Sequence, residues 1–158
     1  MIYAIGVVPK TRNNLKTLWL IYGDCFAADK NIYERIRNGV CEGINQIEGI
    51  EFALTNEIAR VNKVDPLGIT YLRVRGMWGI ENPINVFNYL NLNDYLNNNF
   101  SLICILQKQK YLSLPANSIK QIQELHDQNI LTIKDIQIKS PNNPANLLEA
   151  KTIIYTID

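Results

Sequence analysis

One loop of the sequence gathers residue types that could carry out chemistry. The segment YGDCFAADKN, residues 22–31, contains Asp24, Cys25 and Asp29. Carboxylates are preferred ligands of Mg²⁺, so this loop could hold a cation for a nuclease reaction. Catalysis needs several converging groups, and we expect no Asp…Glu-x-Lys arrangement on adjacent strands to complete such a site. A Gly-Asp turn at the end of a strand therefore explains the loop better than a metal site.

Histidine and cysteine chemistry is limited by the small number of these residues. His126 is the single histidine, which excludes sites that need several histidine ligands, and we interpret it as a half-exposed residue near a helix end. A Cys–His nucleophile would need His126 and a cysteine distant in sequence. The spacing of the three cysteines excludes a Cys-x-x-Cys zinc pair and favours free, mostly buried thiols in a reducing compartment. These cysteines are Cys25, Cys41 and Cys104.

Phosphate-binding glycine motifs are absent from the sequence. Neither G-x-x-x-x-G-K-[ST] nor G-x-G-x-x-G occurs, which argues against a standard P-loop or Rossmann nucleotide enzyme. From the residues alone we therefore expect no catalytic residue, no metal site and no bound cofactor.

A short row of aromatic and basic residues is a second candidate for function. Tyr71, Arg73 and Arg75 alternate along one predicted strand and so share a face, and Lys10 and Arg12 could extend the patch. Such groups could bind phosphate or single-stranded nucleic acid. Charges on an edge strand also prevent unwanted pairing, which is the simpler explanation for so short a run. The net charge of +1 argues against a protein-wide attraction to nucleic acid.

The elements that must position these residues predict an α+β fold with a mixed, largely antiparallel sheet and flanking helices. A composition of 47% hydrophobic and 20% charged residues is typical of a globular protein. We expect a single domain, 1–158, which could comprise a β-β-α-β-β lobe at 1–80 and an α-β-α-β-β lobe at 83–158. No apolar run approaches about 18 residues, and no basic region precedes the first one, so we expect neither a membrane span nor a signal peptide.

Four strands and one helix are predicted in the first lobe. Strands are predicted at 2–8, 15–22, 50–61 and 68–80, and side chains alternate between two faces in the second and the fourth. Apolar residues at three- and four-residue steps predict a helix at 31–48. We expect its apolar face to pack on one sheet that contains both 15–22 and 68–78. That face is formed by Ile36, Val40 and Ile44.

Two helices and three strands are predicted in the second lobe. Asn82 and Pro83 are helix-start signals and predict a helix at 84–96, and a second helix is predicted at 118–128. A change of phase at Lys134-Asp135 suggests a bulge in one of the strands. The predicted strands are 101–107, 130–139 and 151–157.

The order of elements between residues 15 and 80 resembles that of a known family. A strand that ends in LWLIYGD is followed by a short acidic link, the helix IYERIRNGV and two strands, the second of which is ITYLRVRGMWGI. This pattern resembles the tail-terminator or neck-terminator proteins of tailed bacteriophages. The resemblance implies a non-enzymatic structural subunit, commonly hexameric, that forms a ring between the tail tube and the connector.

The resemblance also implies partners and a location. The chain would form a homo-oligomeric ring in the virion with other tail or neck proteins, with no membrane and with nucleic acid only as a lumen contact. Tyr71, Arg73 and Arg75 would face a neighbouring subunit or the lumen. Three alternatives remain open: a metal-dependent nuclease that uses Asp24 and Asp29, a nucleic-acid-binding module that uses the Arg73 strand, and a cytoplasmic interaction subunit of a cell.

Overall fold

In the computed structural model, the described part of the chain forms two compact units. The first unit combines Met1–Ala28 with Glu81–Asp158, and the second is Asp29–Ile80. The predicted division into lobes at 1–80 and 83–158 stays a prediction, although strands from both ranges share one sheet. The structure describes all residues except 12, 47–58, 62–63, 68, 75–78 and 158.

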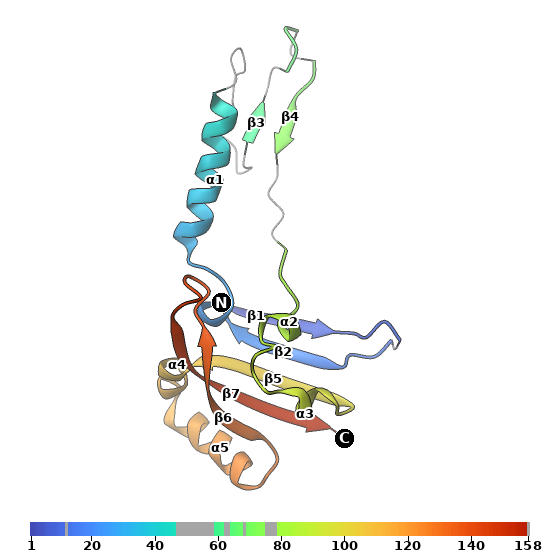
Figure 1. The fold of residues 1–158 in the computed structure, drawn as a ribbon, viewed down its shortest axis with the longest axis vertical. Helices are drawn as coiled ribbons and strands as arrows, with labels where there is room; N and C mark the ends of the chain where they lie inside the picture. Colours follow the sequence, from blue (N-terminus) through green and yellow to red (C-terminus); the bar gives the residue numbers. More distant parts are fainter. Residues whose placement is uncertain (12, 47–58, 62–63, 68, 75–78, 158) are drawn as a thin grey trace. The chain divides into compact units, whose positions relative to one another are not determined.

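The first unit is built on a five-stranded sheet (Figure 1). Its strands are β1 (Ile2–Val7), β2 (Thr17–Tyr22), β5 (Phe100–Gln107), β6 (Thr132–Lys139) and β7 (Leu147–Ile157). Their order across the sheet is β1-β2-β5-β7-β6. The β2–β5 pair is parallel and the other three neighbouring pairs are antiparallel. This confirms the predicted α+β fold with a mixed, largely antiparallel sheet.

The bulge predicted in β6 is wrong. Residues Thr132–Lys139 pair one-to-one with Leu147–Ile154 of β7, without an extra residue on either strand. The pattern of side chains changes at this point because Ile133 is half-buried, whereas Asp135 on the same face is exposed. The change in the side-chain pattern therefore marks the point at which one face of the sheet becomes exposed. The pairing of the two strands continues through it.

The main core lies on one face of the sheet. Trp19 of β2 and Ile103 of β5 are almost fully buried there, together with Phe87. The Phe87 and Trp19 rings stack with their centroids 6.1 Å apart. Burial of such side chains stabilises the fold by about 25 cal/mol per Å² of apolar surface removed from water.

Two short helices, α2 (Pro83–Val86) and α3 (Asn93–Leu96), stand in place of the single helix predicted at 84–96. The predicted start is confirmed, because Asn82 Oδ1 accepts a hydrogen bond from the Ile84 amide at 3.0 Å and Pro83 occupies the first turn. The helix ends early because the segment is rich in asparagine, a poor helix former, and because the chain turns at Phe87 to place its ring in the core.

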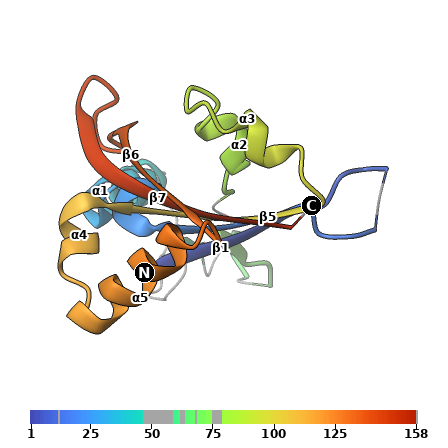
Figure 2. The same cartoon turned by 90° about the horizontal axis from the view of Figure 1, so that it is seen from below.

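The helices α4 (Lys108–Leu112) and α5 (Ala116–Asp127) lie on the opposite side of the sheet from α2 and α3 (Figure 2). The α5 helix corresponds to the helix predicted at 118–128. The α4 helix was not predicted, since five residues make little more than one turn and leave no periodic pattern to detect. Its Tyr111 is buried, so this second face also excludes water in part.

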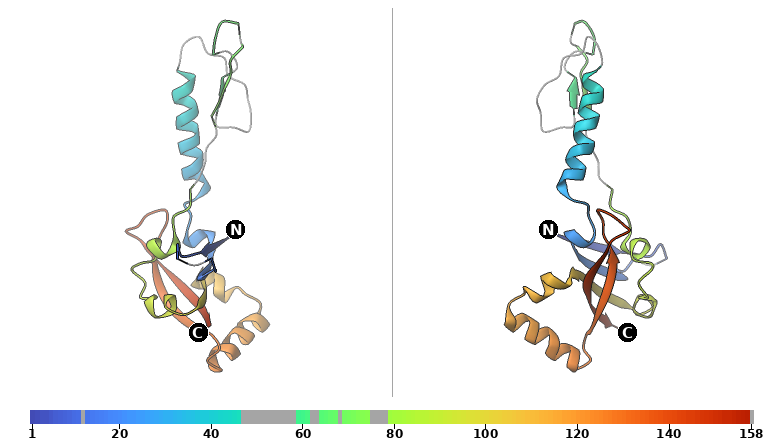
Figure 3. Two further views of the ribbon diagram at one scale, coloured as in Figure 1. Left: turned by 90° about the vertical axis from the view of Figure 1, so that its right-hand side faces the viewer. Right: turned by 60° about the vertical axis from the view of Figure 1, so that its left-hand side comes forward.

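The second unit contains α1 (Lys30–Asn45) and a two-stranded antiparallel sheet of β3 (Ala59–Val61) and β4 (Leu72–Val74). The α1 helix runs alongside this strand pair (Figure 3). The predicted helix is thus confirmed, with ends that differ by one to three residues. Much of the predicted strands 50–61 and 68–80 lies outside the described residues.

The predicted packing of α1 on one sheet that contains both 15–22 and 68–78 is wrong. The described strands of these regions, β2 and β4, belong to different sheets, and both edges of β2 are occupied by β1 and β5. Ile36 is 47% exposed and Val40 is 40% exposed, so this face is not buried as expected. The side chain of Ile44 lies outside the described part of the structure.

In the described ranges, no helix has the length and apolar character that crossing a membrane requires.

Candidate active site

The β6–β7 pair brings four polar side chains together on one face of the sheet. In the antiparallel register, Asp135 lies opposite Lys151 and Gln137 lies opposite Glu149. Successive side chains of a strand point to opposite faces, so these four share one face and Thr152 projects from the other, core-facing side. The strand pair alone therefore assembles two carboxylates, an amide and an ammonium.

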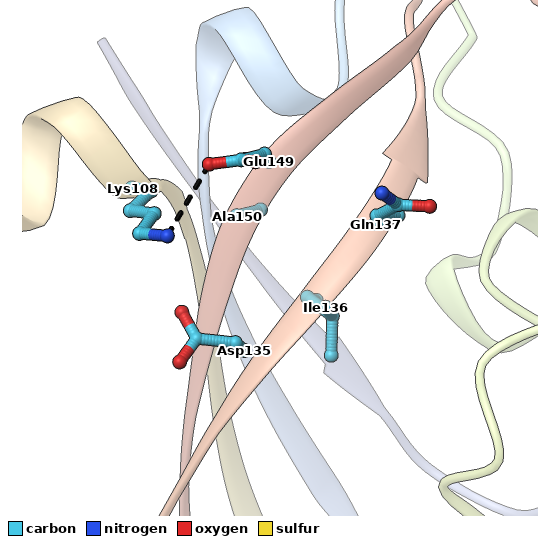
Figure 4. Close-up of a pocket in the computed structure, with 6 residues that line it drawn as sticks. All are labelled: Lys108, Asp135, Ile136, Gln137, Glu149 and Ala150. Carbon is cyan, nitrogen blue, oxygen red and sulfur yellow. Dashed lines mark ion pairs between the residues drawn. The ribbon is translucent and has the colours of Figure 1, made fainter.

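Each of the two carboxylates is paired with a lysine. Lys151 Nζ lies 3.0 Å from Asp135 Oδ1 and 3.1 Å from Oδ2. Lys108 Nζ, at the start of α4, lies 3.3 Å from Glu149 Oε2 (Figure 4). The side chains of Asp135 and Glu149 are 64% and 70% exposed, whereas that of Lys151 is only 16% exposed. The two carboxylates are thus accessible to a ligand from solvent, whereas most of the Lys151 side chain is buried.

A pocket of about 200 Å³ adjoins these groups. It is lined by Lys108, Asp135, Ile136, Gln137, Glu149 and Ala150. Figure 4 shows that the Asp135 and Glu149 carboxylates extend toward the side on which Lys108 lies. A single water needs only about 10–15 Å³ of such space, so the pocket has room for several water-sized groups. A hydrated cation and one phosphate group would fit this space.

The donor set fits a hard divalent cation. Mg²⁺ is commonly bound through one or two carboxylates, with water and substrate phosphate oxygens as the other ligands. Asp135 and Glu149 occupy diagonal positions across the strand pair, a relation in which backbones are about 7–8 Å apart and side chains can reach a common ligand. In the part of the chain that the structure describes, no three His, Cys, Asp or Glu side chains cluster around one point. A cation at this face would therefore depend on water and phosphate oxygens.

The predicted Gly-Asp turn in the loop 22–31 is a short 3-10 helix that directly follows the end of β2. Asp24 is exposed in the short 3-10 helix η1 (Gly23–Cys25), and Cys25 is buried. Burial, reinforced by the charge of Asp24, raises the pKa of the Cys25 thiol to about 12. This thiol therefore stays protonated at neutral pH and is a poor nucleophile. Asp29 belongs to the second unit, whereas Asp24 and Cys25 belong to the first.

His126 has the position that the sequence predicted, near a helix end and half-exposed. It is half-buried in the last turn of α5, and its Nδ1 atom lies 3.1 Å from the Leu131 carbonyl oxygen. The ring thus joins the end of the helix to the segment that leads into β6.

The predicted interface row is only partly described. Tyr71 is 54% exposed, and the Arg60 guanidinium lies over its ring at 5.0 Å from the centroid. Arg73 of β4 pairs with Arg60 of β3 in the register of the two-stranded sheet. Arg75 and Arg12 lie outside the described residues, and Lys10 is exposed. A role of Tyr71, Arg73 and Arg75 in binding a partner stays a prediction.

The prediction that no Asp…Glu-x-Lys arrangement lies on adjacent strands is wrong. The sequence signal is the Glu-Ala-Lys triplet at 149–151, preceded along the chain by Asp135. The predicted last strand begins at residue 151, so it does not include Glu149. Asp135 lies at the predicted bulge. In the observed register, Glu149 and Lys151 both belong to β7, and Asp135 belongs to a regular part of β6.

Comparisons with known proteins identify related sequences. The NgoPII restriction endonuclease family matches residues 1–139. The Type II restriction enzyme NgoPII of Neisseria gonorrhoeae is 48% identical over 155 residues, which cover 98% of this chain and 54% of that protein. The chain thus spans about half the length of this curated relative. No solved structure matches the chain.

These matches overturn the resemblance to phage terminators, and with it the predicted non-enzymatic ring subunit, its virion partners and its place in the virion. The resemblance rested on element order between residues 15 and 80. In the structure these residues do not form one unit, since β2 belongs to the first unit while α1, β3 and β4 belong to the second. The expectation that the protein is not an enzyme is likewise contradicted. The chain belongs to the NgoPII restriction endonuclease family.

Proposed function

We propose that this chain carries out the hydrolysis of DNA phosphodiester bonds in a reaction that depends on a divalent cation. The observation that carries the proposal is the placement of Asp135, Glu149 and Lys151 on one exposed face of adjacent strands. Membership of a restriction endonuclease family supports DNA as the substrate. The proposal keeps the nuclease alternative that the sequence left open. It assigns the site to Asp135, Glu149 and Lys151 in place of Asp24 and Asp29.

The two carboxylates would hold the cation. Asp135 and Glu149 supply negatively charged oxygen ligands, and their exposed side chains can leave their lysine partners when a stronger charge is present. A bound divalent cation neutralises charge on the phosphoryl group and lowers the pKa of a water molecule that attacks it. Asp135 and Glu149 would therefore position their carboxylate oxygens at a pocket that DNA can reach.

The two lysines would contact the substrate in different ways. Lys151 donates to Asp135 in the structure, and its ammonium can donate to a phosphate oxygen placed beside that carboxylate. A fixed donor of this kind stabilises the negative charge that develops on phosphate during hydrolysis. Lys108 is more exposed, at 42%, and is suited to a neighbouring phosphate of the DNA backbone.

Cleavage of DNA would take place where cellular DNA lies. We therefore propose DNA as the partner and the cytoplasm as the location, in place of virion proteins and the virion. The proposal concerns only the chemistry of this face, because the chain spans about half the length of its curated relative.

Plasmid cleavage tests the proposal. Supercoiled DNA is incubated with Mg²⁺ or with EDTA and the wild-type chain, Asp135→Asn, Glu149→Gln or Lys151→Met. We expect Mg²⁺-dependent cleavage by the wild type and a loss of roughly 100-fold or more in each variant, the size typical for removal of one charge-stabilising group.

Asp24→Asn is the matched control, because it makes the same change of charge on an exposed residue of the same unit outside the face. It should cut at the wild-type rate. Wild-type cleavage by Asp135→Asn, or an equal loss in Asp24→Asn, would contradict the assignment of this face.

A further inference from the structure

An aromatic ring lies against the lysine of the proposed active site. Lys151 Nζ is 5.1 Å from the centroid of the Tyr111 ring, which belongs to α4. Tyr111 is only 5% exposed and the Lys151 side chain only 16%, so the contact is largely shielded from water. The negative face of an aromatic ring attracts an ammonium, and the attraction grows when the pair is desolvated.

The main core does not account for the burial of Tyr111. The hydrophobic cluster around Trp19 and Phe87 does not include it, among the residues that the structure describes. It lies in α4 next to β5 and β7, and Leu106 of β5 lies opposite Lys151 in the register of those strands. The ring therefore occupies the sheet face that carries the active-site residues.

Asp135 alone would hold Lys151 weakly. The carboxylate is 64% exposed, and ion pairs with an exposed partner contribute little because solvent screens them and the lysine loses rotamer freedom. The ring restrains the same ammonium from a second element, α4, while the carboxylate restrains it from β6. Two restraints from separate elements define its position better than either does alone.

We propose that Tyr111 is a positioning residue for Lys151: the face of its ring holds the ammonium beside Asp135. The consequence for catalysis rests on the proposed function, whereas the contact itself does not. Glu149 on β7 and Lys108 on α4 pair with each other at this face. Within the described ranges, the contacts of the Lys151 ammonium are with Asp135 and the Tyr111 ring.

Two variants separate the ring face from simple packing. Tyr111→Phe keeps the ring, whereas Tyr111→Leu keeps apolar bulk without an aromatic face. Tyr89→Leu is the control, because Lys139 lies over the Tyr89 ring at a similar 5.0 Å outside the pocket. Thermal unfolding of each variant checks that it is folded.

The first readout does not depend on activity. In protein labelled with ¹³C-lysine, the ε-methylene resonances of Lys151, assigned with Lys151→Arg, should be shifted upfield by the ring current of Tyr111. The shift should persist in Tyr111→Phe and in Tyr89→Leu and disappear in Tyr111→Leu. Wild-type resonances at the position of a free lysine would overturn the proposal, even if Tyr111→Leu failed to fold.

The second readout is the single-turnover rate of DNA cleavage. Tyr111→Phe and Tyr89→Leu should cut within about twofold of the wild type, and Tyr111→Leu should lose about 2- to 30-fold, the range that a cation–π contact supports. Equal rates for Tyr111→Leu and the wild type, or equal losses in both Tyr111 variants, would overturn the positioning role and leave the proposed function standing. A ring-dependent shift in a wild type that cuts no DNA would support the contact and count against the proposed function.

Discussion

Asp135 and Lys151 face each other across the antiparallel β6–β7 pair, with Lys151 Nζ 3.0 Å from Asp135 Oδ1. Glu149 precedes Lys151 by two residues and so projects from the same face of the strand. A single strand pair thus provides two carboxylates that line one pocket, with the Lys151 ammonium bound to one of them. The requirement for these residues can be tested by cation affinity, salt dependence and stability as well as by cleavage.

Removal of either carboxylate should weaken cation binding. Asp135→Asn and Glu149→Gln each replace a charged oxygen ligand by a neutral amide, so the affinity for Mn²⁺ should fall at least about tenfold, since loss of an outer partner alone costs 10–100-fold. Electron paramagnetic resonance of free Mn²⁺ measures this. Asp24→Asn should bind as the wild type does, and an unchanged affinity in both site variants would contradict the assignment of the ligands.

Removal of Lys108 should change DNA binding more than stability. The Lys108–Glu149 pair is exposed at both ends, so Lys108→Met should alter the free energy of unfolding by less than about 1 kcal/mol. If Lys108 contacts a phosphate, the slope of log affinity for DNA against log salt should fall by about one unit.

Binding of a short duplex, measured at several salt concentrations with Ca²⁺ in place of Mg²⁺, checks this expectation. Lys120→Met is the matched control, because Lys120 forms a comparably exposed pair with Glu124 on α5. Equal slopes in the wild type and Lys108→Met would show that Lys108 makes no phosphate contact.

Replacement of a buried hydroxyl should stabilise the first unit. Thr152 is fully buried in the core-facing side of β7, and its Oγ1 has no hydrogen-bond partner among the described residues. An unpaired buried hydroxyl costs about 1–3 kcal/mol, so Thr152→Val should raise the free energy of unfolding by about 1 kcal/mol.

Urea denaturation measures the change, and Thr17→Val is its control. Thr17 is equally buried, but its Oγ1 accepts a hydrogen bond from Trp19 Nε1 at 3.1 Å. The same substitution should therefore destabilise by about 1 kcal/mol at residue 17. A loss of stability in both variants would indicate that Thr152 has a hydrogen-bond partner in solution.

The turn before β4 should depend on the ionisation of Asp65. Hydrogen bonds from the backbone amides of Thr70, then Ile69, and to a smaller extent Leu67, lower the pKa of this carboxyl. Because the folded pKa lies below the unfolded value of about 3.9, this contribution is present above that value. It is lost as the pH falls through the lower, folded pKa.

The amide resonances of Thr70 and Ile69, followed by NMR between neutral pH and pH values below the unfolded pKa, check this sign. They should titrate with a midpoint below about 3.9 in the wild type. They should not titrate in Asp65→Asn. A midpoint above the unfolded value would contradict the hydrogen-bonded turn.

Local pattern was enough to predict most of the elements. A strand was predicted at the position of each of the five strands of the main sheet. In 15–22 the signal was alternation, because successive side chains of a strand point to opposite faces. The Asn82-Pro83 pair predicted the start of α2, because a cap and a proline act on the backbone next to them. The α4 helix had no such signal, being too short to show a period.

The sequence by itself contained Asp135 and the Glu-Ala-Lys triplet at 149–151, but only the tertiary structure decided that they form one site. Asp135 and Lys151 are 16 positions apart, and their opposition depends on the register of two strands. A shift of one residue in that register would place the partners on opposite faces. The ring of Tyr111 reaches Lys151 only because α4 folds back beside β7. Contacts of this kind depend on long-range packing, which periodicity along the chain does not encode.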